Sequence, residues 1–256
     1  MLKRLFGKKA EKTYLDHAVI PEGRRVYAIG DIHGRNDLLK QLLDQISEDD
    51  KARGQAESEI IFLGDLVDRG PDSAGVIETA MQLKDQKTNV RFLMGNHEEV
   101  YLAAARGSEK ATRFFTRIGG KETILSYEIS MKEYMDLDNE MLAIRLPDLF
   151  PKSHVAFVSG FEDQIIIGDY AFVHAGIRPE VPLAEQKSKD LRWIREEFLS
   201  ATQLHEKMIV YGHTINEEVV EQNNRIGIDT GAYYSEKLTA LALEGSKRWY
   251  LDTART

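Results

Sequence analysis

The stretch Glu59-Ile-Ile-Phe-Leu-Gly-Asp-Leu-Val-Asp-Arg-Gly70 decides the fold of this 256-residue chain. An apolar run follows Glu59, and its β-branched and aromatic residues are typical of a short buried strand. A glycine and then the carboxylate of Asp65 come directly after that run. In open α/β sheets, ligand-binding side chains gather just past the carboxyl ends of the strands. The stretch therefore predicts a buried strand with a polar site at its end.

Two further stretches repeat this pattern, one on each side. The apolar runs are 25–29 and 90–94, and they are followed by Gly30-Asp31-Ile32-His33-Gly34 and by Gly95-Asn96-His97-Glu98. Helical patterns separate the three runs, one beginning at Asn36 as N-cap and one opened by Pro71-Asp72-Ser73. The order β-α-β-α-β predicts a parallel sheet with right-handed crossovers. The polar side chains past its strands then share one edge of the sheet.

The rest of the chain predicts a second sheet and an insertion. From about 107 to 160 the strand rhythm gives way to a mostly helical pattern, which we expect to form one wall of a cleft beside the sheet edge. Strands return as a hairpin around Gly168-Asp169 and then at 207–211, 225–228, 238–243 and 248–251. We therefore expect an α/β fold, a two-sheet β-sandwich flanked by helices with a mostly helical insertion. Residues 1–24 are expected to form an N-terminal extension and 25–256 a single domain.

Composition excludes several classes of protein. The chain has no cysteine, which excludes disulfides and every mechanism that needs a thiolate nucleophile. A net charge of −8 gives no electrostatic case for nucleic-acid binding. No stretch approaches the ~20 apolar residues of a membrane span, and we expect a cytoplasmic protein. The basic N-terminus predicts at most a weak contact with anionic membrane through Lys3, Arg4, Lys8 and Lys9, and a frayed terminus is the alternative.

Two more loops carry histidine past an apolar run, His174 in His-Ala-Gly and His213 in Gly-His-Thr. Taken singly, a Gly-Asp pair is usually a turn, and we interpret His17, His154 and His205 as structural. Five loops that each carry Asp, Asn or His after a strand predict something more specific, a pair of divalent metal ions. Hard or borderline cations prefer carboxylate, amide oxygen and neutral imidazole. Mn²⁺ is the expected ion, with Fe²⁺ or Zn²⁺ as alternatives.

These motifs resemble those of the phosphoprotein phosphatase branch of the calcineurin-like metallophosphoesterases, and most of all the bacterial and phage lambda type of serine/threonine protein phosphatase. The resemblance runs from about Arg25 to Leu243 and includes Leu191-Arg-Trp-Ile-Arg195 and Ile228-Asp-Thr-Gly-Ala232. It implies a metal-dependent phosphatase that hydrolyses phosphomonoesters, above all phosphoserine and phosphothreonine in proteins. Attack is expected to be direct, by a hydroxide that bridges the two ions.

The resemblance also implies a role for each residue of the site. It assigns the first ion to Asp31 and His33, the bridging position to Asp65, and the second ion to Asn96, His174 and His213. It makes His97 the general acid that protonates the leaving group, with Asp68 as the carboxylate that orients it. It assigns the phosphate oxygens to Arg69 and Arg195, and it gives Glu98 a supporting role in its loop.

Some of these residues have simpler interpretations. Arg69 could cap a helix, Asp68 could be a charge at a helix N-terminus, and Arg195 could lie on the surface of a helix over Asp190–Leu199. Tyr233 and Arg178 lie near motif residues and could line the site.

Two other functions fit the same sequence. One is a dinucleoside polyphosphate hydrolase on the same fold, a group whose members typically lack an acid at the position of Asp68. The other is a non-catalytic scaffold, which has no use for His97 or Asp68. The expected partner is a phosphorylated protein or a small phosphoester.

Overall fold

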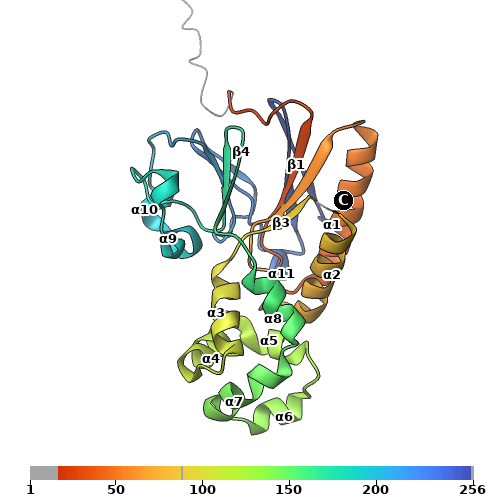
Figure 1. Ribbon diagram of the computed structural model, residues 1–256, viewed down its shortest axis with the longest axis vertical. Helices are drawn as coiled ribbons and strands as arrows, with labels where there is room; N and C mark the ends of the chain where they lie inside the picture. The colour runs from red at the N-terminus through yellow and green to blue at the C-terminus, as the bar shows by residue number, and fades with distance from the viewer. Residues whose placement is uncertain (1–16, 88, 255–256) are drawn as a thin grey trace, which may run out of the picture.

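Two five-stranded sheets pack face to face and carry helices on their outer faces (Figure 1). The computed structural model of the protein describes residues 17–87 and 89–254. The expected fold class is confirmed, including the mostly helical insertion. The expected membrane contact of Lys3, Arg4, Lys8 and Lys9, and most of the expected extension 1–24, lie outside the described residues.

The first sheet has the strand order β10-β9-β1-β2-β3. Its parallel half consists of β1 (Arg24–Ile29), β2 (Glu57–Phe62) and β3 (Val90–Phe92), as the apolar runs predicted. The strands β9 (Thr239–Glu244) and β10 (Lys247–Asp252) add to it antiparallel on the β1 side. Because β1, β2 and β3 are neighbours and run in the same direction, the loops that follow them meet at one edge.

Helices α1 (Asn36–Ala52) and α2 (Ser73–Gln86) connect these parallel strands and cover the outer face of the first sheet (Figure 1). The helix α2 begins as predicted, with the Asp72 carboxylate accepting the Gly75 N–H. The prediction that Asn36 caps α1 is wrong. Asn36 is the first helical residue, and its side chain bonds Asp72 and Thr79 across to α2 instead.

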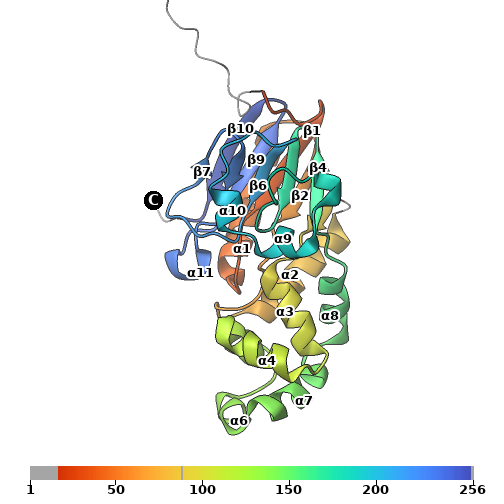
Figure 2. The same cartoon turned by 90° about the vertical axis from the view of Figure 1, so that its left-hand side faces the viewer.

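The insertion follows α3 (Asn96–Ala105), and its regular elements are all helical. It comprises α4 (Glu109–Phe115), a π-helical turn η2 (Thr116–Gly120), α5 (Lys121–Leu125), α6 (Met131–Asp136), α7 (Asn139–Leu149) and α8 (Lys152–Ser159). In both views these helices lie together beneath the two sheets, on the side where β1 and β2 end (Figures 1 and 2).

The second sheet has the strand order β4-β5-β6-β8-β7. The predicted hairpin is formed by β4 (Gln164–Ile167) and β5 (Tyr170–Val173), and β5 runs parallel to β6 (Met208–Tyr211) and then β8 (Arg225–Gly227). The two-residue edge strand β7 (Val220–Glu221) is not among the predicted strands. The short helices α9 (Ser188–Trp193) and α10 (Glu196–Leu199) cover the outer face, after a 3₁₀ turn η3 (Leu183–Glu185), while α11 (Ala232–Ser235) precedes β9 (Figure 2).

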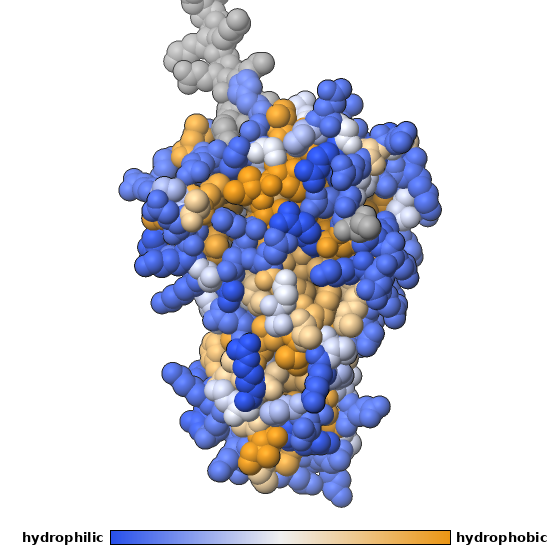
Figure 3. Space-filling view, viewed as in Figure 1, coloured by the Kyte–Doolittle hydropathy of each residue, from blue (hydrophilic) through white to orange (hydrophobic). Residues whose placement is uncertain are grey.

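Three apolar cores hold these layers together. One fills the space between the sheets, around Ala28, Leu63 and Phe172. The largest lies between the first sheet, α1, α2 and the insertion, and the third lies under α9 and α10. On the face shown in Figure 3 the surface is largely hydrophilic, with hydrophobic residues visible between the sheets. No helix in the described part of the chain is long and apolar enough to cross a membrane.

Candidate metal centre

Five loops at neighbouring strand ends bring the predicted metal ligands to one place. Asp31, Asp65 and Asn96 follow the three parallel strands of the first sheet, and His174 and His213 follow the parallel strands β5 and β6 of the second. The six predicted ligands, these five and the His33 side chain, are each 7% exposed or less. A fully buried cluster of acids and imidazoles is costly unless a cation or hydrogen bonds compensate it.

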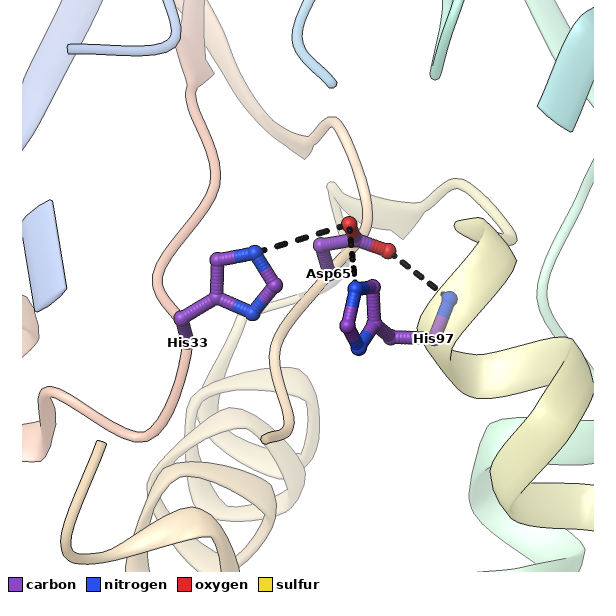
Figure 4. A group of neighbouring side chains, drawn as sticks. All are labelled: His33, Asp65 and His97. Carbon is purple, nitrogen blue, oxygen red and sulfur yellow. Dashed lines mark hydrogen bonds and ion pairs between the residues drawn. The ribbon is translucent and has the colours of Figure 1, made fainter. Parts of the chain in front are cut away.

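Asp65 lies at the centre of the cluster. Its Oδ2 is 3.6 Å from His33 Nε2 and 3.8 Å from His97 Nε2 (Figure 4). Its Oδ1 is 3.4 Å from His174 Nε2. Burial raises the pKa of a carboxyl group, but the surrounding histidines lower the pKa of Asp65 well below its usual value. The residue is therefore an anionic carboxylate whose two oxygens face different imidazoles.

The backbone of these loops is unusual. Five site residues have left-handed backbone angles, with φ of 47° at His33, 50° at Asp65, 74° at Asp68, 68° at Arg69 and 61° at His213. For residues other than glycine such a conformation costs about 1–3 kcal/mol and persists only where the surroundings enforce it. Specific contacts must therefore hold these loops in place.

Glu98 supplies one such contact. Its carboxylate accepts backbone N–H bonds from Asp65 (2.7 Å), Leu66 (2.7 Å) and Gly95 (3.0 Å). Burial, with the Asp65 carboxylate next, raises the pKa of Glu98 to about 7. A side chain at Gly95 would place its Cβ 2.2 Å from Asp65 Oδ1, so this position needs glycine. Glu98 thus fixes the loop that presents Asp65.

His97 and Asp68 form a buried pair, with Nδ1 2.6 Å from Oδ2. Burial lowers the pKa of His97, but Asp65 and Asp68 outweigh it and the pKa of His97 is raised. Asp68 is held in turn by the insertion, because Thr123 Oγ1 of α5 donates to Asp68 Oδ1 at 2.6 Å. The backbone N–H of Asp68 donates to the same Oγ1 at 2.8 Å and to Ser73 Oγ at 3.0 Å.

The two predicted phosphate-binding arginines flank this pair. The guanidinium of Arg69 bonds His33 Nε2 and His97 Nε2, each at 3.0 Å. The side chain of Arg195 is exposed and reaches the His213 carbonyl at 3.5 Å. The prediction of a single helix over Asp190–Leu199 is wrong. The helix is interrupted between α9 and α10, where Arg195 has φ −135° and ψ −95°. The Arg195 side chain therefore lines the cleft and does not lie on a helix surface.

An open cleft of about 540 Å³ leads to the cluster. Its walls include Arg69, His97, Arg117, Trp193, Arg195 and Tyr233. Arg117 belongs to the π-helical turn of the insertion, so the insertion contributes directly to the wall. A basic, open cleft beside a buried His/Asp cluster fits an anionic ligand better than an apolar one.

The residues present fit divalent metal ions. His33, Asp65 and His97 form one group with ligand atoms within 4.8 Å of one another, and Asp65, His174 and His213 form another. The Nε2 atom of His213 is buried without a hydrogen-bond partner. Burial and the neighbouring His174 lower the pKa of His213 to about 2, so its ring is neutral and its lone pair is free. An orphaned neutral imidazole beside a carboxylate is a typical metal ligand.

Asp31 is predicted to hold the first ion together with His33. Its carboxylate accepts the backbone N–H of His213, at 3.1 Å to Oδ1 and 3.0 Å to Oδ2, and it belongs to neither group. Burial, followed by the Asp229 carboxylate, raises the pKa of Asp31 well above its usual value. A cation bound near these two buried carboxylates would reduce the electrostatic repulsion between them. A ligand role for Asp31 stays a prediction.

A comparison with known proteins identifies the family. A family model described as calcineurin-like phosphoesterase matches residues 24–241. The chain belongs to this family. The relative bis(5'-nucleosyl)-tetraphosphatase PrpE (asymmetrical) from Anoxybacillus flavithermus is 29% identical over 235 residues, which cover 83% of this chain and 88% of the relative.

Two solved structures share the calcineurin-like phosphoesterase fold. One is described as a proposed diadenosine tetraphosphatase, with 21% identity and a TM-score of 0.64 over 93% of this chain and 100% of the other. The second is a cold-active protein-tyrosine phosphatase from a psychrophilic Shewanella, with 18% identity and a TM-score of 0.58 over 95% of this chain and 85% of the other. The match to the family model confirms the expected superfamily, whereas the lambda type of protein phosphatase is not shown.

Three residues of this phosphoesterase site had no predicted role. Asp229 follows β8, is 2% exposed, and has a pKa raised to about 6 by burial. Its signal was present, because it also comes directly after an apolar strand. Thr123 and Arg117 lie in the helical insertion, where no strand spacing marks them. Of the two residues left open, Tyr233 lines the cleft, 5.6 Å from the His33 ring, whereas Arg178 pairs with Asp190 and does not line it.

Proposed function

We propose that this calcineurin-like phosphoesterase hydrolyses dinucleoside polyphosphates, cleaving a P–O–P bond with water to give two phosphate-terminated products. The observation that carries this proposal is the name of a relative that matches over nearly its whole length, a bis(5'-nucleosyl)-tetraphosphatase. The arginine-lined cleft supports it, since a polyphosphate chain carries several negative charges. The proposal takes the alternative interpretation of the sequence in preference to a phosphoserine or phosphothreonine phosphatase.

We assign the two ions, Mn²⁺ in preference to Fe²⁺ or Zn²⁺, to the six buried ligands. Asp31 and His33 would hold one, Asn96, His174 and His213 the other, and Asp65 both. The ions would lower the pKa of a water molecule and neutralise charge on the phosphoryl oxygens. The protein contributes fixed positions, because Glu98 and the strand ends hold Asp65 whether or not substrate is present.

Arg69 and Arg195 would bind the reacting phosphate. Both line the cleft, and guanidinium groups match the spacing of phosphate oxygens through paired N–H donors. The guanidinium of Arg69 now bonds two imidazoles, so substrate binding would exchange one or both of these contacts for phosphate oxygens. This exchange leaves His97 Nε2 free to hold a proton for the leaving oxygen.

One observation favours a second function, the hydrolysis of phosphomonoesters, including phosphoproteins. The His97–Asp68 pair, with Nδ1 2.6 Å from Oδ2, has the arrangement of a proton donor oriented by a carboxylate. A serine or threonine alkoxide is a strongly basic leaving group that needs such a donor, whereas a nucleotide phosphate needs it much less. The pair also argues against a non-catalytic scaffold, which would have no use for it.

Steady-state rates on matched substrates test the proposal. Purified protein with Mn²⁺ would be assayed on diadenosine tetraphosphate, a phosphoserine peptide and p-nitrophenyl phosphate, with Asp65→Asn as the negative control. We expect the highest kcat/KM on diadenosine tetraphosphate. A higher kcat/KM on the phosphopeptide would overturn the proposal in favour of the phosphomonoesterase. Equal rates for wild type and Asp65→Asn on all substrates would refute hydrolysis at this centre.

A further inference from the structure

A third arginine lines the cleft beside Arg69 and Arg195. Arg117 lies in the π-helical turn Thr116–Gly120, and its side chain is exposed. The lining residues of the cleft include no aspartate or glutamate, although the whole chain has a net charge of −8. The cleft therefore gathers three positive charges from three separate segments of an acidic protein, and only two of them have an assigned role.

The guanidinium charge of Arg117 is not paired with a carboxylate in the described part of the chain. Nearby arginines have carboxylate partners: Arg113 bonds Glu109 at 2.6 Å, and Arg192 bonds Glu99 at 3.0 Å. Among residues 17–87 and 89–254, no hydrogen bond or ion pair is formed by the side chain of Arg117. An arginine without a partner at the mouth of a basic cleft is available to an anion from solution.

The turn that carries Arg117 is fixed to the site. The Arg69 N–H donates to the Gly119 carbonyl at 2.9 Å. Gly119 has φ of 117°, and a Cβ there would lie 2.7 Å from Arg69 Cγ, so only glycine allows the turn to pack against Arg69. Arg117 and Arg69 are thus set in relation to each other by the backbone.

We propose that Arg117 binds a second phosphate group of the substrate, next to the reacting one, and so selects a polyphosphate chain over a single phosphate. The inference rests on the proposed function and names the feature of the substrate that this site recognises. A monoester offers one phosphate, which Arg69 and Arg195 already match in charge. A polyphosphate places further anionic oxygens along the cleft, where the guanidinium of Arg117 can donate to them.

The test compares Arg117→Ala with Arg113→Ala, a neighbouring exposed arginine of α4 that does not line the cleft. The measured quantity is the ratio of kcat/KM for diadenosine tetraphosphate to kcat/KM for p-nitrophenyl phosphate. We expect Arg117→Ala to lower this ratio about 10- to 100-fold, the loss typical of a charge-assisted hydrogen bond. Arg113→Ala should keep the wild-type ratio. The assignment is overturned if Arg117→Ala keeps the wild-type ratio, whether kcat/KM falls equally for both substrates or for neither.

A second measurement separates this inference from the proposed function. If the wild type fails to cleave diadenosine tetraphosphate, the proposed function is wrong, and the subsite is then tested through inhibition of p-nitrophenyl phosphate hydrolysis. At fixed free Mn²⁺, inorganic tripolyphosphate should inhibit the wild type more strongly than orthophosphate does. Arg117→Ala should lose that preference and Arg113→Ala should keep it. If Arg117→Ala prefers tripolyphosphate over orthophosphate as strongly as the wild type does, the proposed subsite is refuted.

Discussion

Replacing Thr123 by valine tests how strongly the insertion supports His97 and Asp68, the proposed catalytic pair. Thr123 and Asp68 are both fully buried, and Thr123 Oγ1 donates to Asp68 Oδ1 at 2.6 Å. Valine has nearly the same shape but no hydroxyl, so one buried carboxylate oxygen loses its donor. The Asp68 N–H keeps Ser73 Oγ at 3.0 Å as an acceptor. Removing a hydrogen bond to a charged group costs about 1.5–3 kcal/mol, and we expect the free energy of unfolding to fall by that amount.

The matched control is Thr123→Ser, which keeps the hydroxyl and loses a buried methyl group. Its expected cost is about 0.5–1.5 kcal/mol, similar to other losses of one buried methyl group. Urea unfolding of the metal-loaded protein gives both values from the transition midpoints at a common slope. If Thr123→Val proves as stable as Thr123→Ser, the hydroxyl does not hold Asp68 and the reasoning fails.

Four further outcomes follow from the site. Asp65→Asn should weaken or abolish binding of both ions and abolish hydrolysis, and elemental analysis that still finds two ions per chain would contradict the bridging role. His97→Asn should keep the metal but lower kcat on alkyl phosphates about 10²- to 10⁴-fold, and less on p-nitrophenyl phosphate, so equal losses would count against proton donation. Burial lowers the pKa of His97 while Asp65 and Asp68 raise it, with a net rise. Asp68→Asn should therefore lower this pKa and move the alkaline limb of the kcat–pH profile to lower pH, and an unmoved limb would exclude the pairing. Removal of metal by EDTA should lower the melting temperature, because the carboxylates of Asp31 and Asp65 then share a buried site without a cation, and an unchanged melting temperature would argue against this.

Local patterns predicted most of the fold. The runs before Asp31, Asp65 and Asn96 were recognisable because each strand is short, apolar and followed by a glycine, and such signals lie within a few residues of chain. The hairpin around Gly168-Asp169 was recognisable for the same reason. The expected cap Asn36 failed because its side chain is committed to Asp72 and Thr79, a contact between two helices that no local rule contains.

The site was predicted in part. The buried cluster of proposed ligands could be found because all of them follow strands, and strand ends meet at one edge. The contact between Thr123 and Asp68 joins residues 55 positions apart, and Thr123 sits in a helix whose sequence carries no metal or phosphate motif. Arg117 is likewise an ordinary exposed arginine until the packing of Gly119 on Arg69 places it at the cleft. Such positions depend on how the insertion docks, which spacing along the chain does not encode.

The left-handed backbone at His33, Asp65, Asp68, Arg69 and His213 has a consequence for engineering this enzyme. A stability design that scores each position by the backbone preference of its residue type would choose glycine or asparagine at all five. Variants of that kind would lose hydrolysis while gaining thermal tolerance, since the groups removed are the ones proposed to hold the metal ions, donate the proton and bind the phosphate. Useful thermostable variants should therefore be sought in the outer helices, with these five positions held constant.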